Sequence, residues 1–144
     1  MLHDRAMRVR KDRKRELIKS IPLFSHCTKK ELDALTTQFD EVTVPNGKAL
    51  TKQGEPGREF VVLVDGTAEV TQNGHRVNLL GAGDFLGEIA LISGGPRTAT
   101  VTATSDVDLL VLTARSFARV TKEIPSVQAS VLKALSERLA ADAL

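Results

Sequence analysis

The chain has 144 residues, a length typical of one domain that buries its own core. Its apolar content of 42% and charged content of 26% are ordinary for a soluble globular protein, and the net charge of +2 is too small to indicate a nucleic-acid binder. Aromatic residues make up 3%, which argues against a platform that stacks single-stranded bases. Cys27 is the single cysteine, which excludes an internal disulfide and a cysteine-rich metal site. Because no apolar run approaches 18 residues and no signal peptide is recognisable, we expect a soluble, cytoplasmic protein.

Residues 1–16 are predicted to form a basic arm in front of one domain at residues 17–144. Such a charged run is usually a solvated helix or tail, and the alternative is contact with a membrane surface, nucleic acid or an acidic partner. The arm's basic residues other than histidine are Arg5, Arg8, Arg10, Lys11, Arg13, Lys14 and Arg15.

Residues 17–38 have a helical pattern that Pro22 interrupts. Thr28 and Glu31 have the spacing of a capping box, in which each side chain accepts a hydrogen bond from the other residue's backbone N–H. This pair predicts the start of a helix whose apolar face packs on the rest of the domain.

Residues 39–113 are predicted to form many short strands separated by glycine turns. The continuous apolar run Phe60–Val64 is typical of a strand that is buried on both faces. Asn73 and Gly74 indicate a tight hairpin, because both central residues of a type I′ turn need positive φ. The spacing of these strands predicts a double-sheet jelly roll.

Residues 114–144 are predicted to form two helices. Pro125 suits the first turn of the second helix, which we expect to run for about 18 residues. Its apolar residues recur four positions apart, which indicates an amphipathic helix. These residues are Val127, Val131, Leu135 and Leu139.

The stretch at residues 85–101, FLGEIALISGGPRTATV, carries the chemistry. Residues Ile89–Ile92 are long enough for one helical turn, whose free backbone N–H groups attract a phosphate. Arg97 supplies a planar fork of donors that fits two phosphate oxygens. Glu88 is a poor neighbour for phosphate but a good acceptor for a sugar hydroxyl. One anion, one hydroxyl and an apolar wall together indicate a nucleotide monophosphate.

This stretch resembles the phosphate-binding cassette of the cyclic-nucleotide-binding domain family, which includes the cAMP receptor protein and protein kinase A regulatory subunits. The family's pattern runs approximately F-G-E-(L/I)-A-L, a few residues, then P-R-(A/S/T)-A. The residues that fall on it are Gly87, Glu88, Ile89, Ala90, Leu91, Pro96, Arg97, Thr98 and Ala99. The resemblance implies a jelly-roll barrel with an N-terminal helical element, a short cassette helix, and a C-terminal helix that covers the base or pairs with its twin in a homodimer.

By the same resemblance, Glu88 binds the ribose 2′-hydroxyl and Arg97 binds the cyclic phosphate. Backbone N–H groups near Ile89, Ala90 and Ala99 complete the cradle. A cyclic phosphodiester carries one negative charge, so no lysine or magnesium ion is needed beside the arginine.

The expected ligand is cAMP, with cGMP as the alternative. A hydroxyl at Thr98 can bond the 2-amino group of a guanine, but members of the family that prefer cAMP also carry Thr or Ser at this position. Leu86 is a further candidate for ligand contact, and Val70 and Val77 are candidates for lining the base and sugar, with simple core packing as an equal alternative. The expected lid over the base comes from Val131, Leu132, Leu135 and Leu139.

The sequence contains no pattern of residues that indicates an enzyme. The histidines His3, His26 and His75 are scattered, whereas a cupin-type enzyme or a phosphodiesterase needs clustered metal ligands. We therefore expect a binding sensor that couples ligand binding to movement of its C-terminal helix and acts on an effector protein. It is expected to be a free-standing sensor or a regulatory domain excised from a longer chain, without a DNA-binding module. The alternative function is a dimerising interaction module that binds no nucleotide.

Overall fold

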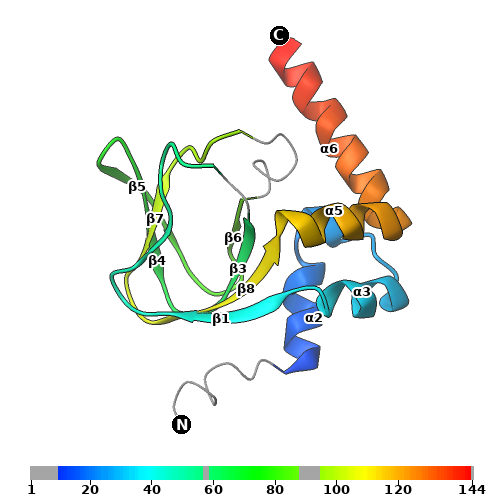
Figure 1. Ribbon diagram of the computed structural model, residues 1–144, viewed down its shortest axis with the longest axis horizontal. Coiled ribbons are helices and arrows are strands. Elements are labelled where there is room, and N and C mark those ends of the chain that lie inside the picture. Colours follow the sequence, from blue (N-terminus) through cyan, green and yellow to red (C-terminus); the bar gives the residue numbers. More distant parts are fainter. Residues whose placement is uncertain (1–9, 57–58, 88–94, 144) are drawn as a thin grey trace.

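The computed structural model describes residues 10–56, 59–87 and 95–143, with the backbone alone for residues 138–143 (Figure 1). Its strands form two four-stranded antiparallel sheets, which confirms the jelly-roll expectation. The first sheet has the order β1-β8-β3-β6 and the second β2-β7-β4-β5. In chain order the strands are β1 (Asp40–Val44), β2 (Ala49–Thr51), β3 (Glu59–Asp65), β4 (Ala68–Gln72), β5 (His75–Leu80), β6 (Phe85–Leu86), β7 (Thr100–Ala103) and β8 (Val107–Thr113).

Between residue 10 and the first strand, three short helical segments precede the sheets: α2 (Lys11–Lys19), the 3₁₀ turn η1 (Pro22–Phe24) and α3 (Lys29–Thr36). The expected division at residue 16 falls inside α2, and residues 1–9 of the arm lie outside the described part of the chain. The capping box of α3 is confirmed. Glu31 N–H donates to Thr28 Oγ1 over 3.1 Å, and Thr28 N–H donates to Glu31 Oε1 over 2.9 Å.

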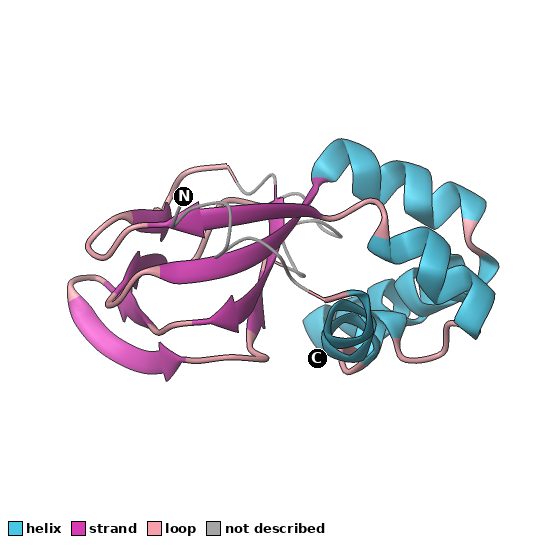
Figure 2. Cartoon of the chain, turned by 90° about the horizontal axis from the view of Figure 1, so that it is seen from below, coloured by secondary structure: helices cyan, strands magenta, loops and turns pink. Residues whose placement is uncertain are grey.

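The central strands of the first sheet, β3 and β8, are buried on both faces, which explains the continuous apolar run in β3. Alternate residues of a strand point to opposite faces. Phe60 and Val62 therefore join the buried cluster under the helices, while Val61 and Leu63 join the cluster between the two sheets. Figure 2 shows the strands on one side of the molecule and the helices on the other. Residues of the first sheet belong to both clusters.

The hairpin between β4 and β5 forms as predicted. Asn73 has a φ of 53° and Gly74 a φ of 81°, the positive values that a type I′ turn needs. Its turn is tied to the residues after β2 by Gln53, whose Nε2 donates to Asn73 Oδ1 and whose Oε1 accepts from Asn73 N–H, each over 2.9 Å.

Two helices follow β8: α5 (Ala114–Glu123) and α6 (Pro125–Ala143). Val127 and Val131 of α6 are buried in the cluster under the helices, and Leu135 packs against it. Leu132 is 60% exposed. Figure 1 shows α6 extending away from both sheets toward the C-terminus. Within the described ranges, no helix combines the length and the apolar composition needed to cross a bilayer.

Candidate functional site

The candidate site lies where β6 ends and β7 begins. β6 is followed by Gly87, and the chain is described again from Gly95 to the start of β7 at Thr100. The predicted helical turn and the site residues Glu88, Ile89 and Ala90 lie outside the described residues. The described part of the site therefore consists of Leu86, Gly87 and residues 95–99.

The backbone of Arg97 is fixed by the turn after β2. Arg97 N–H donates to Glu55 O and Gly54 N–H donates to Arg97 O, each over 2.8 Å. An isolated β-bridge between Pro56 and Pro96 extends this pairing by one step. Because both polar groups of the Arg97 backbone are used, the direction in which its side chain leaves the backbone is fixed.

The Arg97 side chain connects the two sheets. Arg97 lies three residues before the start of β7 in the second sheet. Its Nη2 donates to the backbone carbonyl of Glu59, at the start of β3 in the first sheet. The side chain is half-buried. This burial lowers the pKa of Arg97, and the charge of Glu59 acts in the opposite direction. The guanidinium remains charged, because arginine does not lose its proton in proteins.

Gly87 provides the space that the guanidinium occupies. Its φ is +94°, a conformation that residues with side chains rarely adopt. A Cβ at this position would overlap the carbonyl oxygen of Glu59 and Nη1 of Arg97. The structure thus brings Gly87 and Arg97 into contact, although nine residues separate them in the sequence.

The residues that follow Arg97 are held by side chains of the second sheet and its connections. Gln72 Nε2 donates to the carbonyl of Thr98 over 3.2 Å, and Thr51 Oγ1 donates to the carbonyl of Ala99 over 3.2 Å. Thr98 itself is exposed. Sequence reasoning missed the supporting roles of Gln72, Thr51 and Glu59. No sequence pattern marks Glu59, because its backbone oxygen is the group that takes part.

The apolar candidates are divided between the interior and the surface. Leu86 and Val70 are half-buried and pack against the cluster between the two sheets. Val77 is 53% exposed on β5. Val70 lies opposite Val101 of β7 and Asn78 of β5, and the register of the hairpin shifts between Val70 and Thr71.

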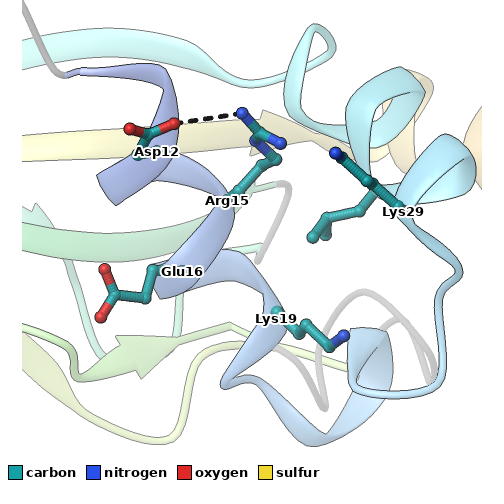
Figure 3. Close-up of a pocket in the computed structure, with 6 residues that line it drawn as sticks. Asp12, Arg15, Glu16, Lys19 and Lys29 are labelled. Carbon is teal, nitrogen blue, oxygen red and sulfur yellow. Dashed lines mark hydrogen bonds and ion pairs between the residues drawn. The ribbon is translucent and has the colours of Figure 1, made fainter.

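A separate shallow pocket of about 400 Å³ lies between α2 and α3. Figure 3 shows Arg15 beside Asp12, with their ion pair at 3.2 Å, and Lys29 on the neighbouring helix. Arg15 Nε also lies 3.5 Å from an oxygen of Asp33, so these charges hold α2 against α3. Within the described ranges, no group of three or more His, Cys, Asp or Glu side chains is placed to hold a metal ion. The residues lining the pocket are Asp12, Arg15, Glu16, Lys19, Lys29 and Leu32.

Comparison with known proteins identifies the domain. The model of the family described as "Cyclic nucleotide-binding domain" matches residues 41–123, more than half of the chain. The chain belongs to the cyclic nucleotide-binding domain family. The matched region includes both sheets and the candidate site, which places the chain among binding modules.

Relatives of the cyclic nucleotide-binding domain occur in proteins of different architecture. A cyclic nucleotide-gated potassium channel of Rhizobium etli is 36% identical over 123 residues, which are 85% of this chain and 34% of the channel. The N-terminal domain of a transcriptional regulator from Streptomyces coelicolor has a TM-score of 0.76 at 28% identity, covering 88% of this chain and 94% of that chain. The regulatory domain of Toxoplasma gondii PKA, solved with cAMP, has a TM-score of 0.70 at 25% identity, covering 79% of this chain and 46% of that chain. The chain thus spans about a third of the length of the curated channel that it matches.

Proposed function

We propose that this domain binds a cyclic nucleotide, cAMP in preference to cGMP, and that α6 transmits occupancy of the site to an effector protein. The observation that carries the proposal is the position of Arg97. Its guanidinium is half-buried between the two sheets, beside a glycine whose lack of a side chain makes room for it. The fold therefore holds one guanidinium in a defined position, and one positive charge is what a singly charged cyclic phosphate requires.

Arg97 is the proposed phosphate ligand. A guanidinium has five N–H donors in a fixed plane, so it can donate to the Glu59 carbonyl and still present N–H groups to phosphate oxygens. Glu88 is proposed to accept from the ribose 2′-hydroxyl. The backbone N–H groups of Ile89, Ala90 and Ala99 are proposed to complete the phosphate cradle, and Leu86 to contact the ligand beside it.

The preference for cAMP is supported by the similarity to the PKA regulatory domain that was solved with cAMP. The exposed Thr98 keeps cGMP as the alternative, since its hydroxyl can bond a guanine amino group. Val70 and Val77 are the proposed contacts to base and sugar. Titration with each nucleotide separately measures the preference, and a tighter cGMP complex would reverse it.

The proposed output is a movement of α6. Val131 and Leu135 of α6 pack with the helices, Leu132 is exposed, and the helix extends away from the sheets (Figure 1). Covering a bound base requires α6 to turn toward the site, which brings Leu132 and its neighbours over the ligand. A spin label near the end of α6 and a second in β4 measure this change as a shorter distance when cAMP is added.

The deciding experiment is calorimetric titration of the wild type and of Arg97→Ala with cAMP and cGMP. Loss of a charge-assisted contact is expected to weaken binding by about ten- to a hundredfold. Arg119→Ala, which removes an exposed arginine of α5, is the matched control and should bind as the wild type does. Equal affinities of the wild type and Arg97→Ala would reject the role of Arg97.

The exposed Leu132 on a long helix supports a second candidate function, a dimerising interaction module. A contiguous apolar patch on a protein surface commonly marks a subunit contact, and Leu132 is proposed to belong to such a patch. Sedimentation at several protein concentrations and thermal melts with millimolar cAMP and cGMP distinguish the two functions. A concentration-dependent dimer whose melting temperature no nucleotide changes would favour the second.

A further inference from the structure

One carboxylate, that of Glu31, accepts hydrogen bonds at the beginnings of two helices. It caps its own helix α3 by accepting from Thr28 N–H at 2.9 Å. It also accepts from the start of α6, where Ser126 Oγ lies 2.7 Å from Oε1 and Ser126 N lies 3.3 Å from Oε2. Ninety-five positions separate Glu31 and Ser126 in the sequence.

The Ser126 N–H in the first turn of α6 depends on this carboxylate, because the N–H groups of Val127 and Gln128 already donate to the carbonyl of Ile124. Helix α6 begins at Pro125, and the preceding residue is Ile124, a buried side chain with no acceptor. Ser and Asp side chains at that position would normally accept from the free N–H groups of the first turn. Glu31 supplies the acceptor from another helix, and its negative charge also suits the positive end of the α6 dipole.

The contact fixes the direction of α6 as well as the position of its first residue. Both oxygens of one carboxylate are used, one by the hydroxyl and one by the N–H of Ser126. A rotation of α6 about its first turn must therefore lengthen at least one of the two hydrogen bonds. In the structure that these bonds stabilise, α6 extends away from the sheets (Figure 1).

We propose that Glu31 is a positioning residue that holds α6 in its uncovered orientation, so that the Glu31–Ser126 contact opposes closure of α6 over the nucleotide. The part of this inference that concerns nucleotide affinity rests on the function proposed above. It follows that cutting the contact makes closure easier, and nucleotide binding then becomes tighter. A variant that merely damaged the fold would bind more weakly.

Three variants of the full chain separate the contact from ordinary helix capping. Glu31→Gln keeps an oxygen that can cap α3, since Gln also serves in a capping box, but its amide NH₂ cannot accept from Ser126 N–H. Ser126→Ala removes the hydroxyl from the other side. Thr28→Ala is the matched control, because it removes the hydroxyl that caps α3 and leaves both Ser126 contacts in place.

The first measurement is amide hydrogen exchange at Ser126, Val127 and Gln128 without nucleotide. We expect Glu31→Gln to raise the exchange rate of the Ser126 amide about tenfold, and Thr28→Ala to change it by less than about twofold. An unchanged rate in Glu31→Gln would overturn the inference.

The second measurement is calorimetric titration of the same variants with cAMP. Glu31→Gln and Ser126→Ala are expected to bind about three- to tenfold more tightly than the wild type, because a larger fraction of the protein has α6 free to close. Faster exchange with unchanged or weaker binding would overturn the inference. If the wild type binds neither cAMP nor cGMP, the proposed function fails, and the exchange rates alone then decide whether Glu31 fixes α6.

Discussion

At the scale of single residues, the described part of the site depends on the contact between Arg97 and Gly87. Arg97 needs a path between the sheets to reach the carbonyl of Glu59, and Gly87 leaves that path open. The sequence motif contains both residues but does not show that they touch. The conformation of Gly87 and the absence of its side chain are two separate requirements, and substitutions can separate them.

Gly87→Ala is expected to destabilise the fold and to weaken nucleotide binding. The new methyl group takes a disfavoured backbone conformation and also displaces the Arg97 guanidinium. Gly83→Ala is the matched control: Gly83 has a φ of +92°, yet nothing lies within 4 Å of its Cβ position. Both variants should lose about 1–2 kcal/mol of stability to backbone strain. Gly87→Ala should lose more than Gly83→Ala, because its methyl group also overlaps the backbone carbonyl of Glu59, and the loss of cAMP affinity should be confined to Gly87→Ala. Urea unfolding and titration measure the two effects, and equal affinities of both variants would contradict the argument.

Glu31 gives the fold a defined acid sensitivity. The hydrogen bonds from Thr28 and Ser126 lower the pKa of the Glu31 carboxyl, although burial acts in the opposite direction. Since the folded pKa lies below the ordinary value of about 4.3, the stabilisation is complete above that pH and disappears as the pH falls through the folded pKa.

Urea unfolding between pH 6 and pH 3 tests this dependence. The wild type should be more stable than Glu31→Gln near pH 6, and the difference should shrink below about pH 4.3. Circular dichroism is the suitable signal, because the chain contains neither Trp nor Tyr. A difference that stays constant over the whole range would show that the charge of Glu31 contributes nothing.

At the scale of elements, the sequence predicted the parts that depend on near neighbours. The capping box, the Asn73–Gly74 turn and the doubly buried strand each follow from residues within a few positions. Contacts between distant segments have no such signal. Neither the pairing of Gln53 with Asn73 nor that of Glu31 with Ser126 follows from helix or strand periodicity. The same limit applies to α6, whose apolar stripe was predicted, while its direction depends on what those residues meet.

The β4–β5 hairpin turn offers a test of these two kinds of information. Asn73→Gly keeps the positive φ but removes the side-chain contact with Gln53, whereas Asn73→Ala removes the contact and also strains the backbone. Asn73→Ala should therefore be less stable than Asn73→Gly by about 1 kcal/mol in urea unfolding. Equal stabilities would mean that the left-handed conformation costs nothing at this turn.

At the scale of the whole molecule, the first sheet joins the helices to the site. Phe60 of β3 packs edge-on against Phe24 of η1, with ring centroids 5.8 Å apart. Phe60 also contacts Phe85 of β6, two residues before Gly87, with ring centroids 5.7 Å apart. The N-terminal helical element and the candidate site are therefore connected through one aromatic side chain. The first sheet also contributes residues to the cluster between the two sheets. Neither the helices nor the second sheet therefore has a core that is independent of the first sheet.

Shared burial of this kind predicts one cooperative unfolding transition. Calorimetry should give equal van't Hoff and calorimetric enthalpies, because the helices and the second sheet both pack against the first sheet and lose that packing in the same transition.

Phe60→Ala should lower the stability by about 3–5 kcal/mol, the cost of removing a large buried ring, and should leave a single transition. Lys133→Ala, at an exposed position of α6, is the control and should change stability by less than about 0.5 kcal/mol. Two separate transitions in the wild type would show that the helices fold independently of the sheets, and the first sheet would then be a boundary between two units.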